Sequence, residues 1–412
     1  MYIIINRYSP RSIQLKEISA KRIKDCIVIA PIHFQKKYED LEDEIKNDLT
    51  VIYLDDFVLP KMVQTLRDIS KKFQIIKIVT LCEEDVFICG ILNDYFLNKN
   101  TSSMSSIAFK DKYVMRSLLT GIIKQPYFRL INSLEDIEIF FKKTNTDFAI
   151  IKPRDGAGAS GVKKITKNDI ENPTFFNEYW IDKFMIEEFV TMDSMLTCDG
   201  YSIDSNIERA FFHEYDNLVL DSIIEGKDLL LRTHKDYFKD NQILKRSIEI
   251  CTTILKNFSV AGEVTPFHFE LFFDRKTGEI IFCEVGKRFG GGEIPTLILN
   301  SFGVNLIKEY WDRVFNTKPS KINRYELEKP RKISGFYQAF RANGVVKYVP
   351  AINDLDWITI YRSFVEVGEN TTTTNTVVES VFLSVFTSSS EKEYKEHVKY
   401  LRKLREQVYQ FE

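Results

Sequence analysis

The chain has 412 residues, of which 44% are apolar and 28% charged, and its formal net charge is −2. This length exceeds one ordinary domain of about 100 to 200 residues, so we expect two to four globular units with a large buried core. The nearly balanced charge argues against nucleic-acid binding, and no apolar run is long enough for a membrane span or a secretory signal.

The cysteines lack CxxC spacing, and most of them lie in apolar, strand-like segments such as IIFCEV. This usage is typical of reduced cysteines in a protein core and predicts a cytoplasmic location. They are Cys26, Cys82, Cys89, Cys198, Cys251 and Cys283.

Residues 1–105 alternate short β-like runs with polar, amphipathic stretches. The runs are YIIIN, CIVIAP, LTVIYL and IIKIVTL, and segments such as PKMVQTLRDISKKF lie between them. This βαβ order predicts a small open parallel sheet with helices on both faces and ligands at the carboxyl ends of its strands.

Residues 106–311 read as an α+β unit of two lobes. Helices are expected at 107–145, followed by a β-rich lobe at about 147–190 with the strands DFAIIKP, VKKIT and FMIEEFV. Three further strands are expected within 197–223, namely LTCDGYSID, ERAFFHEY and NLVLDSII, before a helix at about 239–257. Residues 312–412 form a third expected unit, rich in β-structure and ending in a charged helix.

A lysine and a glycine-rich loop lie together at the end of the strand DFAIIKP. Lys152 ends this strand, and the loop that follows contains Gly156, Gly158, Ser160 and Gly161. Backbone N–H groups of such a loop can bind phosphate oxygens while the ammonium neutralises their charge. The segment matches neither the GxxxxGK[ST] loop nor a GxGxxG turn that opens a helix, and a plain hairpin turn is the alternative.

Two glutamates lie fourteen residues apart in a predicted hairpin with strands HFELFFD and EIIFCEV and a turn near Gly278. Strand alternation places Glu270 and Glu284 on one face, followed by Arg288 and the run GGG. Magnesium in nucleotide sites takes one or two carboxylates together with substrate phosphates, so the pair is a candidate metal site. The alternative is a surface hairpin with solvated charges.

In this order, the segments resemble the ATP-grasp superfamily, particularly its carboxylate–amine and L-amino-acid ligases, over residues 85–310. The resemblance implies that ATP phosphates are held by Lys112 and Lys152 and that adenine faces the hinge Glu187, Glu188, Phe189 and Val190. It further implies Mg²⁺, or Mn²⁺ as an alternative ion, on Glu270 and Glu284, and an acyl phosphate steadied by Arg288. The β-rich 312–412 segment is similar to the C-terminal domain of biotin-carboxylase-like members.

Two positions depart from the family pattern. Many members have Asn two residues after the second metal carboxylate, whereas this chain has Gly286, so one oxygen ligand is missing or replaced by water. The ribose-binding carboxylate is displaced as well, and Asp193 is its candidate. His268, two residues before Glu270, is interpreted as a hydrogen-bonded core histidine rather than a general base.

The resemblance implies an ADP-forming ligase that activates an amino-acid carboxylate as an acyl phosphate and joins it to an amine. The alternatives are loading of an amino acid onto a carrier-protein thiol, a biotin-type carboxylase, and a nucleotide-binding homologue without turnover. A carrier protein is a possible partner under the thiol-loading alternative, and the resemblance makes a homodimer possible, since related ligases often pair.

Overall fold

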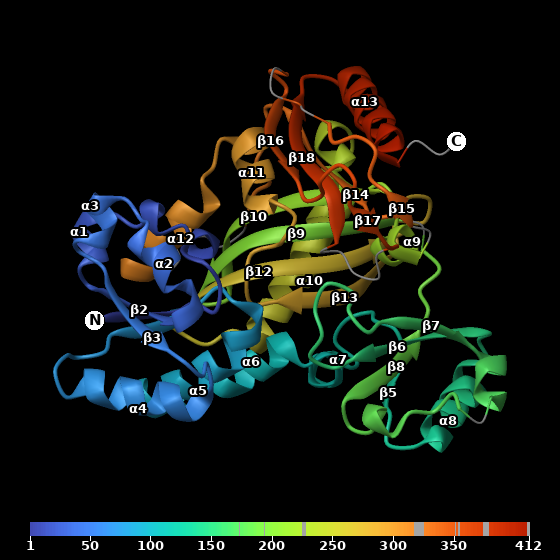
Figure 1. Ribbon diagram of the computed structural model, residues 1–412. Coiled ribbons are helices and arrows are strands. Elements are labelled where there is room, and N and C mark those ends of the chain that lie inside the picture. Colours follow the sequence, from blue (N-terminus) through green and yellow to red (C-terminus); the bar gives the residue numbers. More distant parts are fainter. Residues whose placement is uncertain are drawn as a thin grey trace.

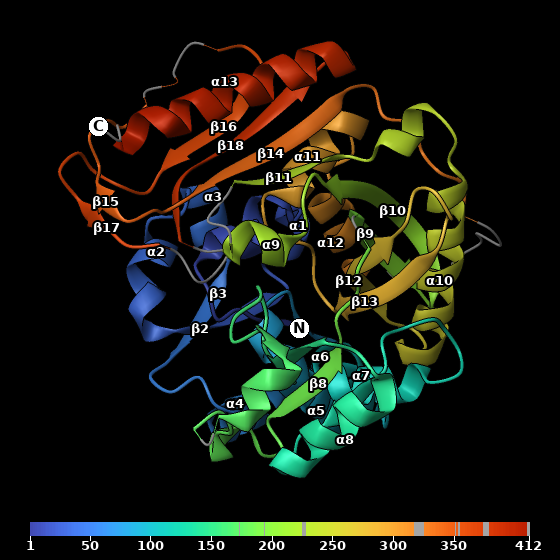
Figure 2. The same cartoon turned by 90° about the vertical axis from the view of Figure 1, so that its right-hand side faces the viewer.

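The computed structural model of the chain describes residues 1–409 apart from 173, 193, 225–227, 317–324, 351, 353–354 and 374–378. Figure 1 shows three bodies of structure: an N-terminal unit, a small lobe, and a large sheet topped by the C-terminal helix. The same arrangement seen from the side is shown in Figure 2.

The N-terminal unit is a parallel four-stranded sheet with strand order β3-β2-β1-β4. Side chains alternate along β1: Ile3 and Ile5 pack with α4 and α5, whereas Tyr2 and Ile4 pack with α2 and α12 on the other face. Both faces are therefore covered by helices, as the sequence predicts. The elements are β1 (Tyr2–Ile5), α1 (Ala20–Ile23), β2 (Cys26–Pro31), α2 (Gln35–Glu39), α3 (Asp43–Lys46), β3 (Thr50–Leu54), α4 (Leu59–Ser70), β4 (Lys77–Thr80) and α5 (Val86–Leu97).

A separate antiparallel sheet, of order β5-β8-β6-β7, forms the small lobe. Two helices lead into it, and a third packs on the sheet through Ile137, Phe140 and Phe141. We call this body the flap lobe. Its elements and the helices before it are α6 (Ser102–Lys110), α7 (Lys112–Leu119), β5 (Phe128–Leu130), α8 (Leu134–Thr144), β6 (Phe148–Pro153), β7 (Lys163–Thr166) and β8 (Phe184–Glu188).

The large sheet has eight antiparallel strands in the order β13-β12-β9-β10-β11-β14-β18-β16. It continues across the predicted boundary at 311/312, because β11 pairs with β14. Its elements are β9 (Ser194–Ile203), β10 (Asn206–Tyr215), α9 (Val219–Ile224), β11 (Leu229–Thr233), α10 (Gln242–Phe258), β12 (Val264–Phe273), β13 (Ile280–Gly286), α11 (Ile294–Phe302), α12 (Leu306–Phe315), β14 (Ile333–Phe340), β16 (Ile358–Ser363), β18 (Ser380–Ser388) and α13 (Glu391–Tyr409), with a two-stranded ribbon of β15 (Gly344–Val345) and β17 (Asn370–Thr371).

The predicted fold class is confirmed, but the predicted strand NLVLDSII is wrong. The chain leaves β10 at Tyr215 and forms the short helix α9, in which the Ser222 N–H donates to the Leu218 carbonyl. A short apolar run bounded by polar residues fits a buried helix turn as well as a strand, so periodicity could not separate the two.

All six cysteines are free thiols, and five of them are buried. This agrees with the expectation of reduced core cysteines. In the part of the chain that the structure describes, none of the helices has the length and apolar character needed to cross a membrane.

Trp311 on α12 joins the N-terminal unit to the rest of the chain. It is fully buried, its ring packs against Tyr310 and Phe315, and its indole N–H donates to the Ile13 carbonyl at 2.9 Å. We expect Trp311→Ala to cost about 3–5 kcal/mol because it opens a cavity and leaves a buried carbonyl unpaired. Trp311→Phe, which retains most of the ring, should cost less. Thermal unfolding of both variants tests this, and an alanine variant as stable as the wild type would contradict it.

Candidate active site

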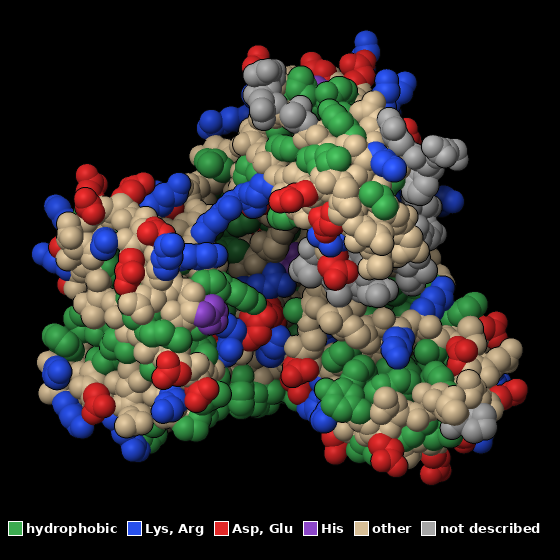
Figure 3. Space-filling view, viewed as in Figure 1, with side chains coloured by type: hydrophobic (Ala, Val, Ile, Leu, Met, Phe, Trp, Pro, Cys, Tyr) green, Lys and Arg blue, Asp and Glu red, His purple; other side chains and the backbone are tan. Residues whose placement is uncertain are grey.

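A cavity of about 490 Å³ lies between the flap lobe and the large sheet. Basic and acidic side chains meet in the central hollow of the surface (Figure 3). The predicted site residues that line the cavity are Lys112, Lys152, Gly156, Gly158, Ser160, Glu187, Glu188, Phe189, Val190, Glu270, Glu284 and Arg288. The structure therefore brings together residues that are up to 176 positions apart in the sequence.

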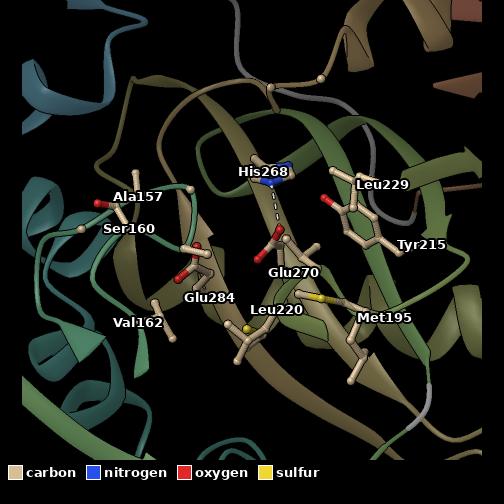
Figure 4. A pocket seen from close by; sticks show the side chains of 18 of the residues that line it. Ala157, Ser160, Val162, Met195, Tyr215, Leu220, Leu229, His268, Glu270 and Glu284 are labelled. Carbon is tan, nitrogen blue, oxygen red and sulfur yellow. Dashed lines mark ion pairs between the residues drawn. The ribbon is translucent and has the colours of Figure 1, made fainter. Parts of the chain in front are cut away.

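The two glutamates of the hairpin lie directly opposite each other on β12 and β13. Their carboxylates point into the cavity side by side (Figure 4). Burial would raise the pKa of Glu284, but the charges of Lys112, Lys152 and Arg288 outweigh it and lower the pKa to about 2. Glu284 is therefore ionised at neutral pH and available as an oxygen ligand.

This donor set fits a magnesium ion that is shared with phosphates. Among the described residues, no group of three or more His, Cys, Asp or Glu side chains is arranged to hold a metal alone. Two opposed carboxylates are what Mg²⁺ takes from a protein when phosphate oxygens and water complete its shell. Glu270 and Glu284 would hold the ion.

Lys112, the first residue of α7, reaches from the helix start to the carboxylate pair. The Asp111 side chain caps the helix by accepting from the N–H groups of Tyr113 and Val114, and it also pairs with Arg154 of the flap lobe. From this position, the Lys112 ammonium lies 3.4 Å from Oε2 of Glu284 and donates to the Gly156 carbonyl. The charges of Glu284 and Glu83 outweigh burial and raise its pKa, so the ammonium stays charged.

Lys152 lies at the end of β6 in a buried network of ion pairs. Its Nζ is 2.6 Å from Oε1 of Glu187, and Oε2 of the same carboxylate is 2.9 Å from the Arg116 guanidinium. Burial would raise the pKa of Glu187, but the charges of Arg116 and Lys152 lower it. Two cations surround one anion, so this side of the cavity, where phosphates would bind, carries net positive charge. The Glu187 carboxylate thus belongs to this network, although the sequence suggests a contact with adenine or ribose.

The glycine-rich loop joins β6 to β7 and covers one side of the cavity. Ala157, Ser160 and Val162 of this segment lie beside Glu284 (Figure 4). Gly161 has a φ of 72°, and a Cβ there would lie 2.9 Å from Pro153, so this turn requires glycine. The loop brings backbone groups to the position where phosphates would lie.

The predicted hinge continues from β8 into the segment after it. Glu188 is anchored to Tyr127, whose N–H donates to the Glu188 carboxylate at 2.8 Å, while Phe189 and Val190 line the cavity. The Phe189 ring is covered by the ammonium of Lys164, 3.8 Å from its centroid. Asp193, the candidate ribose carboxylate, lies outside the described residues.

Arg288 follows β13 and is held by a residue that the sequence reading missed. Its Nε donates to Oε2 of Glu83 at 2.6 Å, and its Nη1 donates to the Phe289 carbonyl. Glu83 belongs to the N-terminal unit and is 205 positions from Arg288. A signal for it existed, because it lies three residues after the end of the parallel strand β4, and ligands of such sheets gather at the carboxyl ends of strands.

His268 bridges the carboxylate pair and the glycine run. Its Nδ1 is 2.8 Å from Oδ1 of Asp199, and its Nε2 is 3.6 Å from Glu270. Burial lowers its pKa, but Asp199 and Glu270 outweigh this and raise the value to about 9. Gly290 donates its N–H to Asp199, and a Cβ there would lie 2.4 Å from Oδ1 of Asp199, which explains glycine at this position. The histidine is hydrogen-bonded as predicted, but as a cation beside the site.

The far side of the cavity is a mostly apolar wall that the sequence did not reveal. We call it the apolar wall. It is built from strands β10, β11, β14 and β18, together with the segment before and within α9. Its described residues include Tyr215, Leu218, Leu229, Leu231, Phe336, Gln338 and Leu383. Tyr215 and Leu229 lie across the carboxylates from the glycine loop (Figure 4).

Comparison with known proteins gives consistent results. No family model matches the chain. It is 21% identical over 360 residues to an L-arginine-specific L-amino acid ligase from Bacillus subtilis, a match that covers 85% of this chain and 83% of that protein.

Solved structures are similar over nearly the whole length. The L-amino acid ligase from Bacillus licheniformis superposes with a TM-score of 0.71 at 15% identity, covering 98% of this chain and 96% of that one. The biotin carboxylase domain of 2-oxoglutarate carboxylase from Hydrogenobacter thermophilus, solved as a dimer with MgADP, ADP and bicarbonate, gives 0.61 at 12% identity, covering 97% and 88%. The resemblance seen in the sequence is thereby confirmed, and the chain has the fold of the ATP-grasp ligases.

Proposed function

We propose that the chain is an ATP-dependent ligase that activates an amino-acid carboxylate as an acyl phosphate and joins it to an amine. The observation that carries this proposal is the cavity itself, in which cations, an opposed carboxylate pair and an apolar wall face one another. The similarity to L-amino acid ligases supports the choice of amino acids as substrates. Binding of a carrier protein and formation of a homodimer remain predictions.

In the proposed reaction, a carboxylate oxygen of the substrate attacks the γ-phosphorus of ATP, and the bond to the bridging oxygen of ADP breaks. The amine then attacks the acyl carbon, phosphate leaves with the bonding electrons, and the amine loses a proton. Both steps require positioning and charge neutralisation more than covalent help from the protein.

The residues around the cavity divide this work. Lys112 and Lys152 would bind phosphate oxygens, and Arg288 would face the developing charge on the transferred group. Mg²⁺ on Glu270 and Glu284 would supply further neutralisation of the phosphates. The glycine-rich loop would keep water from the acyl phosphate.

Replacing Glu284 by glutamine should lower substrate-dependent ADP release by about 10² to 10³-fold, because one charged ligand of the metal site is lost. Glu279→Gln is the matched control, since Glu279 lies at the outer end of the same hairpin and pairs with Lys124. The assay is ADP formation at saturating MgATP, with circular dichroism to verify folding. Undiminished turnover in Glu284→Gln, or AMP and pyrophosphate as products, would refute the acyl-phosphate route.

The apolar wall predicts the class of acid that is activated. Burying leucine- or phenylalanine-like surface against Leu229, Leu231 and Phe336 is favourable, whereas burying an unpaired charge there is costly. We expect apolar amino acids to give at least about tenfold higher kcat/KM than arginine, lysine or aspartate. A pairwise panel with mass spectrometry of the products measures this. A preference for arginine would count against this assignment, and no ADP release with any pair would count against the ligase itself.

The titration of His268 predicts that the folded protein loses stability as the pH rises above neutrality. Its folded pKa of about 9 is above its ordinary value of 6.5, so its pairing with Asp199 stabilises the fold fully below about pH 6.5 and is lost as pH rises through 9. The thermal midpoint of the wild type should therefore fall between pH 6.5 and 9.5. His268→Gln should be less stable at pH 6 and show a shallower decline, and an unchanged slope would contradict this role.

A further inference from the structure

Position 286 lies between the two functional residues Glu284 and Arg288 on the strand β13 and its exit. Residues two apart on a strand point to the same face, so a side chain at 286 would extend beside the Glu284 carboxylate. Members of the resembled family often carry an asparagine there, whereas this chain has glycine. The Gly286 backbone is not in the left-handed region, so its conformation does not require glycine.

The closeness of neighbouring side chains, rather than backbone conformation, explains glycine at this position. A Cβ on Gly286 would lie 3.1 Å from Oε2 of Glu83 and 3.5 Å from Cγ of Arg288. The first distance is shorter than ordinary van der Waals contact, and an asparagine would add three more heavy atoms on the same side. The ion pair between Glu83 and Arg288 therefore occupies the place where a family-type side chain would lie.

Glu83 is held firmly in that place. It begins the turn η4 (Glu83–Asp85), which starts three residues after the end of β4. The same turn ends at the fully buried Asp85, which pairs with Arg7. Lys110 lies 3.2 Å from the other oxygen of Glu83. Burial would raise the pKa of Glu83, but Arg288 and Lys110 lower it, so the carboxylate is charged. Its side chain is only 14% exposed.

Arg288 gains a fixed orientation from this partner. Its Nε is bound by Glu83 and its Nη1 by the Phe289 carbonyl, so two of the three guanidinium nitrogens are fixed. An arginine without such a partner would lose rotamer entropy each time it engaged the transferred group.

We infer that Glu83 is a positioning residue: it orients Arg288 from the N-terminal unit, and the missing side chain at Gly286 leaves the space that its carboxylate occupies. This inference rests on the proposed function for its catalytic consequence. Its steric part, the shared space of Glu83 and position 286, is independent of that function.

A double-mutant cycle tests it, with Glu83→Ala, Gly286→Asn and the double variant, measured both by thermal midpoint and by kcat and KM for ATP. Glu83→Gln examines the charge alone. Glu84→Gln is the matched control, because Glu84 lies in the same turn but is exposed.

We expect Glu83→Gln to lower kcat by about 10- to 100-fold with KM for ATP changed less than about threefold, since the nucleotide is bound by other residues. Gly286→Asn should lower both the thermal midpoint and kcat by displacing Glu83. In the double variant, the asparagine gains the vacated space, so the midpoint should exceed that of Gly286→Asn, and kcat should be no lower than in Gly286→Asn because both changes remove the same partner of Arg288. Glu84→Gln should match the wild type.

Strictly additive effects in both measurements, or wild-type kcat and stability in Gly286→Asn, would overturn the inference. If the wild type releases no ADP with any acid and amine, the proposed function fails instead. The double-mutant cycle measured by thermal midpoint then still shows whether Glu83 and a side chain at 286 compete for the same space.

Discussion

Compensation of buried charge is the constraint on which the site depends. Glu284 and Glu187 are carboxylates in a cavity largely removed from water, where an isolated charge would be strongly disfavoured. Each remains ionised because cations from other elements surround it, Lys112 and Arg288 for Glu284, and Arg116 and Lys152 for Glu187. These cations come from α7, β6 and the exit of β13. The charges of these carboxylates are therefore compensated only when the flap lobe and the large sheet are in contact.

The N-terminal unit takes part in the same balance. Glu83 offsets the charge of Arg288 and Lys110, so the N-terminal unit affects the cations beside the carboxylate pair. Trp311 and α12 pack on the second face of the parallel sheet, whose strand β4 leads to Glu83. Packing far from the cavity thus sets the geometry of a charged group within it.

Local patterns predicted much of this arrangement. Alternation along HFELFFD and EIIFCEV placed Glu270 opposite Glu284, and the strand before the glycine loop placed Lys152 at its mouth. Glu83 and Asp199 were missed because their roles arise from contacts 205 and 69 positions away along the chain. The apolar wall was missed for a similar reason, since it combines strands from both sides of the expected 311/312 boundary. The α9 segment shows the remaining limit: a mostly apolar run of six to eight residues does not distinguish a helix turn from a strand.

The division of strands among the sheets has a mechanical consequence. The hairpin of Glu270 and Glu284 and the apolar wall belong to one eight-stranded sheet, whereas Lys152 and the glycine-rich loop belong to a different four-stranded sheet. Sliding the wall relative to the hairpin would break backbone bonds between β9 and its neighbours β12 and β10, whereas tilting the flap lobe breaks no ladder between the described strands. In the proposed reaction, the acid would therefore contact a rigid surface, and the nucleotide would contact a lobe that can tilt.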